Sequence, residues 1–521
     1  MSIEHHFGPT SRRTFLQQTG ILLGGAAFAG FASESALAQP RAQDAPAGTL
    51  TFGHFGDVDN YDPLTNALDL YQNYGRLLVF SALTAYDANL NLIGDLAESW
   101  ELQDTSWVFK LRSGVTWHDG TPFTADDVKY TVEHILDPAT GSFLTAQIGD
   151  GTTITVVDPQ TIQITLTAVN ASYPDQLTGV SIIKKDSGEA NRDAPIGTGP
   201  FAFESWSPNE ATVFVKNQTY FVSGTPLLES VIFRPVPEPT VAITNLTAGS
   251  LDAVSNQLVL PQTATELETR EGISLIVVDP STALAYANIL FKEAPYTDKR
   301  FRQALAMCLD LDAVKELVYA GRGTPTNNFI PQLSWAYTEI PNYAFDPVAA
   351  RALFAEAGVT DGFKTSILTI EGYPDLIAIA PIWQDGLKQA GIDASIETLE
   401  INAWIERWVA GEYEITLNFD INGPDPQRLF VADFLLHIAA DEWNDPELVA
   451  KIQELSSAAI ATADQEVRKG VYAELQTLLH DAVPMLPIYR PAIVGATSDK
   501  VTGFAIDGKG FYHFEQATIA E

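Results

Sequence analysis

Cysteine is almost absent from this sequence: Cys308 is the only one in 521 residues. A lone cysteine excludes an intramolecular disulfide framework and a cysteine-rich metal module. It lies in the helical pattern Phe301, Ala304, Leu305, which favours a small buried hydrophobic residue. The eight histidines stand apart, without the spacing of metal ligands. We therefore expect no bound metal and no cofactor.

Basic residues are also scarce, with 30 Lys and Arg against 66 Asp and Glu and a formal net charge of −36. Nucleic acids and anionic membrane surfaces are held mainly by Lys and Arg, so both are disfavoured as partners. Hydrophobic residues still make up 46% of the chain and charged residues only 18%, which is enough to bury a large core. At about 100–200 residues per domain, the length predicts two to four domains or lobes.

The sequence has no apolar run long enough to span a membrane, which takes about 20 residues. Its N-terminus instead has the order of an export leader. Arg12 and Arg13 precede the apolar stretch 21–31, and Ala36 and Ala38 supply a small-x-small cleavage site. We expect a twin-arginine signal peptide over residues 1–38, cleaved after Ala38, and a soluble periplasmic product.

The common signatures of catalysis are missing as well. The chain has no G-x-S-x-G elbow, no H-E-x-x-H helix, no G-x-x-x-x-G-K-[ST] loop and no glycine fingerprint after a strand. Acidic residues are so abundant that carboxylate pairs carry no information about a glycosidase site. The sequence thus favours binding over chemistry, and an exported hydrolase or cofactor enzyme is the alternative.

Strands and turns dominate the first half of the chain. Segments 152–166 and 201–216 each contain two apolar runs around a turn, and both predict hairpins. Thr124 and Asp127 predict a capping box at the start of a helix over 124–135.

Helices alternate with short apolar strands in the second half, which is the rhythm of a parallel or mixed sheet. The composition changes near Ser281, and the tail 501–521 returns to strands and aromatic residues. We therefore expect the chain to cross back to its first lobe. The pattern predicts helices over 301–309, 311–319, 347–357 and 381–390, with strands over 365–370 and 394–398.

Four segments resemble one known family. Residues 85–100 (AYDANLNLIGDLAESW) and 107–128 (WVFKLRSGVTWHDGTPFTADDV) look like the signature of the extracytoplasmic peptide/nickel-type solute-binding proteins of ABC importers. The segments PIGTGPF at 195–201 and RQALAM at 302–307 resemble two further landmarks of this family. The resemblance covers nearly all of the predicted mature chain.

The resemblance implies a large two-lobed α/β protein with the type II, cluster C-like periplasmic-binding-protein fold and an extra subdomain inserted in lobe I. Such proteins close around a ligand like a hinged clamp. The expected division assigns 39–87, 196–283 and 498–521 to the lobe I core, 88–195 to the inserted subdomain and 284–497 to lobe II.

Ligand contacts are expected first in a second-lobe loop. In peptide-binding members of the family an aspartate there pairs with the ligand's α-ammonium group, and Asp420 falls on the matching position of a slightly longer loop. Asn422 and Asp425 lie in the same loop, although Asp425 also suits a turn or cap. Dipeptide-binding members carry an arginine in the segment that here contains Glu371 and Tyr373. Without that arginine, we expect longer peptides, or cationic or neutral polar ligands.

Two further groups are expected near the ligand. Trp404, Arg407 and Trp408 lie on a helix predicted over 402–410, where one tryptophan walls the cavity or both pack in the core. In lobe I, the segment after Pro63 meets ligand in members of the family. Its candidate residues are Asn66, Leu68, Asp69 and Tyr71.

The function that the resemblance implies is that of the substrate-binding component of an ABC importer. It captures a peptide-like or other polar organic solute, performs no chemistry, and delivers the solute to an inner-membrane permease complex as a monomer. A nickel or haem carrier of the same family is a minor alternative.

Overall fold

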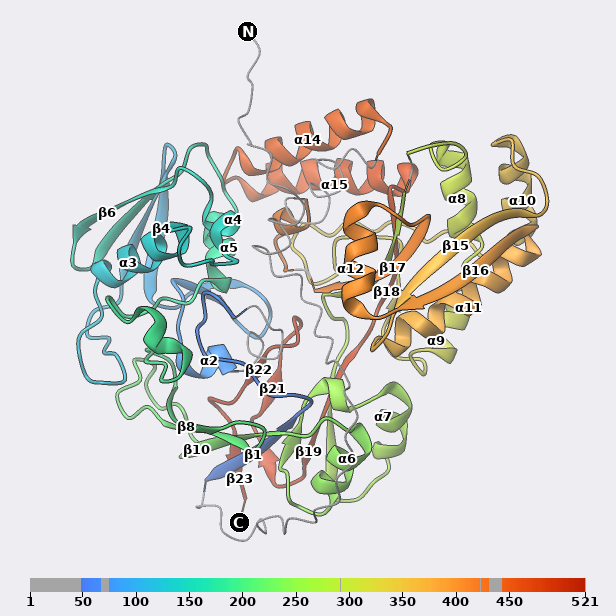
Figure 1. Ribbon diagram of the computed structural model, residues 1–521. Helices are drawn as coiled ribbons and strands as arrows, with labels where there is room; N and C mark the ends of the chain where they lie inside the picture. The colour runs from blue at the N-terminus through green and yellow to red at the C-terminus, as the bar shows by residue number, and fades with distance from the viewer. Residues whose placement is uncertain (1–47, 67–74, 291, 422, 431–442, 521) are drawn as a thin grey trace.

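The structure is a computed structural model that describes residues 48–66, 75–290, 292–421, 423–430 and 443–520. Over these residues the chain forms two lobes, each built on one large sheet (Figure 1). The predicted leader, residues 1–38, lies outside the described ranges. No helix within those ranges has both the length and the apolar character that a membrane crossing requires.

The lobe I sheet combines six strands between residues 49 and 278 with one strand from the C-terminal part of the chain. Its order is β12-β19-β11-β1-β10-β9-β8, and every residue of the central strand β1 is buried. The lobe also holds the helices α2 (Arg76–Val79), α6 (Pro239–Thr247) and α7 (Pro261–Leu267). Its strands are β1 (Thr49–His54), β8 (Phe201–Ser207), β9 (Ala211–Lys216), β10 (Ser230–Pro235), β11 (Ala253–Val254), β12 (Ile273–Val278) and β19 (Ile493–Ser498).

Between β1 and β8 the chain builds a separate antiparallel sheet in the order β4-β5-β7-β6. Its buried residues, Trp107 and Ile164 among them, belong to the same hydrophobic cluster as Phe52 of β1. The segment predicted as an inserted subdomain, 88–195, thus shares one core with the lobe I sheet. The elements of this region are β2 (Thr84–Tyr86), β3 (Leu92–Gly94), β4 (Ala97–Gln103), β5 (Ser106–Leu111), α3 (Ala125–Leu136), α4 (Thr145–Ile148), β6 (Thr153–Asp158), β7 (Thr161–Thr165) and α5 (Tyr173–Gln176).

The lobe II sheet is mixed, with the order β14-β18-β13-β17-β15-β16. β15 runs parallel to β16 and β17, whereas β13 is antiparallel to β17 and β18. Its strands are β13 (Ala283–Ile289), β14 (Thr324–Pro325), β15 (Phe363–Ile370), β16 (Ile392–Leu399), β17 (Ile415–Ile421) and β18 (Met485–Arg490). Its helices are α8 (Lys299–Met307), α9 (Leu311–Leu317), α10 (Pro347–Glu356), α11 (Pro374–Gln389), α12 (Ile401–Ala410), α14 (Pro446–Ile460) and α15 (Gln465–Ala482).

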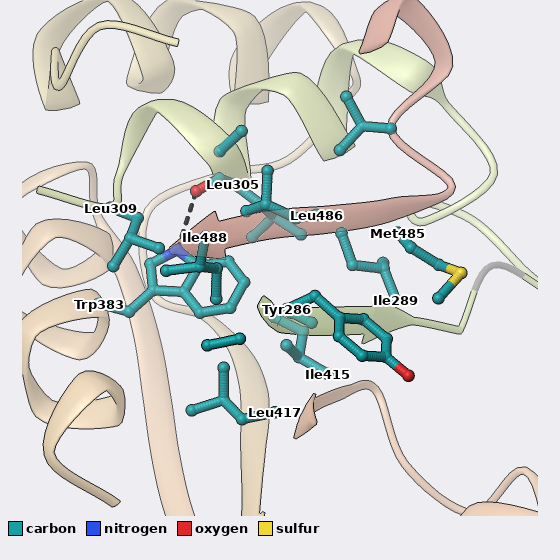
Figure 2. Close-up of a cluster of buried hydrophobic side chains, with 14 of the residues drawn as sticks. Tyr286, Ile289, Leu305, Leu309, Trp383, Ile415, Leu417, Met485, Leu486 and Ile488 are labelled. Atoms are coloured by element: carbon teal, nitrogen blue, oxygen red, sulfur yellow. Dashed lines mark hydrogen bonds between the residues drawn. The ribbon is translucent and has the colours of Figure 1, made fainter. Parts of the chain in front are cut away.

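Trp383 of α11 lies in the middle of the lobe II core. Its side chain is fully buried, and its indole N–H donates to the carbonyl oxygen of Leu305 in α8 at 2.8 Å (Figure 2). Leu417 of β17 and Ile488 of β18 belong to the same cluster. Because a buried N–H without an acceptor costs about 1–3 kcal/mol, this bond helps to fix α11 against α8.

The chain passes between the lobes twice. It leaves lobe I after β12 and enters β13 at Ala283, and it returns from β18 to β19 across Pro491 and Ala492. β12 pairs with β19 and β13 pairs with β18, so the two crossings lie side by side. Because β19 belongs to the lobe I sheet, lobe II ends before Ile493, and the sequence-based boundary at 497 is too late.

Local sequence signals are confirmed at several elements. The backbone N–H of Thr124 donates to the Asp127 carboxylate at 2.8 Å, which completes the predicted capping box of α3. The two predicted hairpins form as β6–β7 and β8–β9. The start of the helix predicted over 381–390 is wrong. α11 begins at Pro374, which takes the first helical position, and Pro381 is accommodated inside the helix.

The close packing at Gly197 provides a test of the fold. A Cβ placed on Gly197 would lie 1.7 Å from the carbonyl oxygen of Val79, at the end of α2. Gly197→Ala therefore forces the two segments apart, and we expect it to destabilise the protein by about 1–3 kcal/mol or more. Urea unfolding measures the loss.

Gly470→Ala in α15 is the matched control, because no atom lies within 4 Å of its added Cβ. Alanine favours a helix interior over glycine by about 0.5–1 kcal/mol, so this variant should be as stable as the parent or more stable. Equal stabilities for the two variants would contradict the packing described here.

Candidate functional site

Residues of both lobes line a partly open cavity with a volume of about 550 Å³ next to the crossing strands. Lobe I contributes the segment 256–262 together with Ile493 and Val494 of β19. Lobe II contributes Tyr319 and the segment 372–375. Apolar side chains form most of the wall, with polar groups at a few points. This size and composition are typical of sites for small organic molecules.

The lobe II wall lies where two parallel strands end. β15 and β17 run in the same direction, and both carboxyl ends face lobe I. Ligands of α/β sheets bind in the crevice at this edge, because the connections that leave the strands diverge there. Gly372, with φ of +88°, allows the sharp turn from β15 into α11 that brings Tyr373 and Asp375 to the cavity.

One carboxylate belongs to the cavity wall. Asp375 lies in the first turn of α11 and accepts a hydrogen bond from the Tyr319 hydroxyl at 3.0 Å. Tyr319 in turn stacks on Tyr489 of β18, with ring centroids 4.3 Å apart and planes 6° apart. Burial raises the pKa of Asp375 above its ordinary value, and it also raises the pKa of Tyr319.

One contact between the lobes lies at the edge of the cavity. Arg322 of lobe II pairs with Glu268 of lobe I at 2.6 Å and donates to the hydroxyl of Thr265 at 2.9 Å and to the carbonyl oxygen of Pro261 at 3.3 Å. Because Glu268 is about half exposed, this ion pair is worth at most about 1 kcal/mol. The contacts of Arg322 mainly fix the position of α7 against lobe II and add little stability.

A second and more deeply buried contact joins the lobes near α5. Within lobe II, Arg468 of α15 pairs with Asp425 at 2.6 Å, with only 8% and 5% of the two side chains exposed. The hydroxyl of Ser172, which precedes α5, donates to the other oxygen of Asp425 at 2.9 Å. The backbone N–H of Ala171 also donates to the carbonyl oxygen of Ile460 at 2.9 Å. We call Ser172, Asp425 and Arg468 the interlobe triad.

Two more buried charges lie beside the interlobe triad. Asp175 accepts a hydrogen bond from the Tyr86 hydroxyl, and the Lys509 ammonium group lies 4.8 Å from the centre of the Tyr86 ring. Burial, together with the negative charge of Asp425, raises the pKa of Asp175 to about 7. Burial lowers the pKa of Lys509 to about 8. The contact therefore combines two acids with two bases, which limits the electrostatic cost of bringing the lobes together.

Asp420 does not line this cavity. Phe419 and Ile421 line it, and alternation along β17 turns Asp420, between them, to the opposite face of the sheet. On that face it acts on the buried guanidinium of Arg490, whose pKa is lowered to about 9 by burial and raised in part by Tyr337 and Asp420. The ammonium contact predicted for Asp420 thus stays a prediction, separate from the cavity described above.

The tryptophans predicted near the ligand pack in the lobe II core. Trp404 is fully buried, stacks on Trp408 with ring centroids 5.2 Å apart and donates its indole N–H to Thr416 at 2.8 Å. Arg407 pairs with Glu397 at 2.6 Å. None of Trp404, Arg407 and Trp408 is part of the cavity wall. The core-packing alternative describes both tryptophans, because their i, i+4 spacing places them on the buried face of α12.

The remaining candidates are divided between the cavity, the core and the ranges that are not described. Tyr373 lines the cavity, whereas Glu371 is exposed and lies outside its wall. Asn66 is buried in lobe I, where its side-chain amide donates to the carbonyl oxygen of Asn60 at 2.5 Å. Asp425 serves the interlobe triad. Four candidates lie outside the described residues: Leu68, Asp69, Tyr71 and Asn422.

Sequence reasoning missed Asp375 and the partners of Asp425. Asp375 follows Pro374, and a proline followed by an acidic residue is typical of the first turn of a helix. The sequence-based prediction instead begins the helix at the second proline, Pro381, and so leaves Asp375 outside it. No local signal marks Ser172 as a partner of Asp425, because their contact joins segments far apart in the chain.

The fold and this geometry define a class of protein. Two lobes joined by adjacent crossings, a cavity at their interface and contacts near α5 and α7 together describe a two-lobed binding protein that closes around a small solute.

Comparison with known proteins identifies the family within this class. Residues 91–435, more than half of the chain, match the family model described as bacterial extracellular solute-binding proteins, family 5, middle. The chain belongs to this family.

Similar proteins cover nearly the whole chain. The dipeptide-binding protein of Escherichia coli is 26% identical over 529 residues, covering 93% of this chain and 97% of that protein. Heme-binding protein A of Haemophilus influenzae is also 26% identical, with coverages of 86% and 87%. A periplasmic binding protein from Helicobacter pylori in complex with the peptide STSA superposes with a TM-score of 0.76 at 24% identity, covering 91% of this chain and 98% of that one. This likeness shows the fold.

The interlobe triad gives a second prediction. Arg468→Met leaves the buried Asp425 carboxylate without its cation, so we expect a loss of about 3–5 kcal/mol of stability. Ser172→Ala removes two hydrogen bonds between the lobes, the one that Ser172 donates to Asp425 and the one that it accepts from Arg468, and keeps the ion pair, which costs at least about 1.5–3 kcal/mol of closure. Guanidinium unfolding measures the stability of Arg468→Met, and small-angle scattering measures how far the lobes open in Ser172→Ala.

Lys451→Met is the control for Arg468→Met. Lys451 pairs with Glu454 and Glu474 on the exposed surface of α14 and α15, where such pairs contribute at most about 1 kcal/mol. If Arg468→Met is no more destabilising than Lys451→Met, the buried pair of Arg468 and Asp425 does not have the structural role given to it.

Proposed function

We propose that this protein is the substrate-binding component of an ABC importer. It captures a peptide-like or other polar organic solute between its lobes and delivers the solute to an inner-membrane permease complex. The observation that carries the proposal is the cavity of about 550 Å³ at the interface of the two lobes, in a chain of family 5. The names of relatives that bind dipeptides and the peptide STSA support a peptide-like ligand.

Capture works by closure. The cavity wall comes from both lobes, so a bound solute contacts both and stabilises the closed form over the open form. A solute that touched one lobe alone would bind both forms equally and shift nothing. The closed form then presents to the permease a surface that joins both lobes, and no bond of the solute is made or broken.

The proposed ligand contacts divide into two groups. Tyr373 belongs to the cavity wall, and Glu371 lies next to it at the end of β15. Asp420 is proposed for an ammonium group on the other face of β17. The proposal keeps four candidates from the sequence: Leu68, Asp69, Tyr71 and Asn422.

Location and assembly follow from the sequence. We propose export by the twin-arginine route with cleavage after Ala38, a periplasmic location, and a monomer as the working form. The order of Arg12, Arg13, the apolar stretch 21–31 and the small residues before the cleavage point supports this route.

A nickel or haem carrier is not proposed, even though one relative is named for heme binding. Within the ranges that the structure describes, no group of three or more His, Cys, Asp or Glu side chains is placed to hold a metal ion.

A thermal-shift screen with pools of di-, tri- and tetrapeptides and of small polar solutes tests the proposal. A true ligand stabilises the protein by RT ln(1 + [L]/Kd), about 2.7 kcal/mol at a hundredfold excess over Kd. Mass spectrometry of the released ligand should show that it is returned unchanged. Appearance of a hydrolysed or oxidised product would contradict the transport role.

A pair of variants locates the binding. Ala378→Phe fills the cavity from α11, and it should abolish the ligand-induced shift. Ala355→Phe on the exposed face of α10 makes the same chemical change elsewhere and should leave the shift intact. A full shift in Ala378→Phe would place the ligand outside this cavity.

A further inference from the structure

The charges of the cavity wall are few and unequal. Two charged side chains, Arg322 and Asp375, lie among the described residues of the wall. Arg322 already pairs with Glu268 at 2.6 Å and donates to the hydroxyl of Thr265 at 2.9 Å. Asp375 has no ion-pair partner among the residues that the structure describes, and its recorded side-chain donor is the neutral hydroxyl of Tyr319. Asp375 is therefore the acidic side chain of the described wall that has no cationic side chain as a partner.

The surroundings of Asp375 are apolar. Leu258, Val318 and Phe419 belong to the same wall. The Asp375 carboxylate accepts from the Tyr319 hydroxyl and from backbone N–H groups of Asp375 and Leu376, and all of these donors are neutral. Burial raises the pKa of this carboxyl group, which shows that the cavity gives its charge less solvation than water does. A cationic group of a ligand would stabilise the charged form of this carboxylate, because the described wall offers it no positively charged side chain as a partner.

We propose that Asp375 is the anionic anchor of the cavity, and that the cavity takes the ammonium or guanidinium group of a ligand whose remaining contact surface is apolar. This inference rests on the proposed function only in treating the cavity as a ligand site. It assigns the cation preference of this cavity to Asp375, at the start of α11, and is separate from the ammonium contact proposed for Asp420 on the other face of β17, where Asp420 acts on the charge of Arg490.

The physical basis is the difference between charged and neutral partners. A hydrogen bond between two charged groups in a poorly solvated wall is worth more than one between neutral groups, and it corresponds to at least tenfold in affinity. A neutral ligand of the same shape leaves the carboxylate unpaired. An anionic ligand meets a like charge at short range. The cavity should therefore rank ligands in the order cation, neutral, anion.

Three small probes test this ranking without any assumption about the natural solute. Hexylammonium, hexanol and hexanoate share one apolar chain and differ only in the charge of the end group. Isothermal titration calorimetry at pH 7.5 and 0.15 M salt measures each of them against the parent protein and two variants. The salt screens the general attraction of cations to a chain with a net charge of −36.

The variants are Asp375→Asn and Asp385→Asn. Both lie on α11 and both remove one negative charge, so the net charge of the protein changes equally. Asp385 is exposed and outside the cavity wall. Asparagine keeps the shape of the side chain, and circular dichroism confirms that each variant is folded.

We expect the parent and Asp385→Asn to bind hexylammonium at least tenfold more tightly than hexanol, with hexanoate weakest, and Asp375→Asn to bind hexylammonium and hexanol within about threefold of each other. The assignment would be overturned if Asp375→Asn preferred hexylammonium over hexanol as strongly as the parent does. It would also be overturned if the parent showed no preference for hexylammonium. Failure of the transport role would show differently, as chemical change or absence of shift in the solute screen, and would leave these probe affinities unaffected.

Discussion

The buried guanidinium of Arg490 holds together the two crossings between the lobes. It lies at the end of β18, and it donates to the carbonyl oxygens of Thr282 and Ala283 at the start of β13 and to those of Asn328 and Phe329. Burial lowers the pKa of Arg490 to about 9, and the charge of Asp420 offsets part of that effect. One side chain thus ties both crossings together beside the cavity, at the place where a hinge between two lobes would lie.

Closure in this geometry depends on contacts away from the hinge. Arg322 joins α7 to lobe II, and the interlobe triad joins the segment before α5 to α15; Figure 1 shows α15 reaching from lobe II toward α5. The first contact is solvent-exposed and weak, whereas the second is buried and leaves a large penalty if one partner is lost. Separating the lobes would break the hydrogen bonds of Ser172 and Ala171 near α5 and the contacts of Arg322 near α7, whereas the ion pair of Arg468 and Asp425 lies within lobe II and would stay intact.

Much of the fold could be predicted from the sequence, because its signals are local. The capping box of Thr124 and Asp127 and the two hairpins need only neighbouring residues. The site could be predicted less well, since it depends on which face a side chain takes and on which segments meet. Trp404 and Trp408 illustrate the first difficulty: their spacing shows that they share one face of α12, but it does not show whether that face lines a cavity or packs in the core. Ser172 and Asp425 illustrate the second difficulty, because they lie far apart in the sequence and meet only in the folded protein.

The large excess of acidic residues says less about the ligand than about the partners that it excludes. Many of the acidic side chains placed by the structure cap helices, close turns or form ion pairs, as Asp346, Asp158 and Glu397 do. Within the described cavity wall a single acid, Asp375, remains without a cation. A net charge of −36 thus excludes anionic polymers as partners, and one carboxylate sets the charge preference of the cavity.

The central claim is that the lobes close around a solute, and pulsed electron paramagnetic resonance tests it most directly. Spin labels at the exposed positions Val157 in β6 and Val348 in α10, with the buried Cys308 replaced by Ala, report the distance between the lobes. We predict a longer, broader distance distribution in ligand-free protein and a shorter, narrower one once a solute identified by the thermal-shift screen is bound. Identical distributions with and without bound solute, confirmed by calorimetry, would contradict the account.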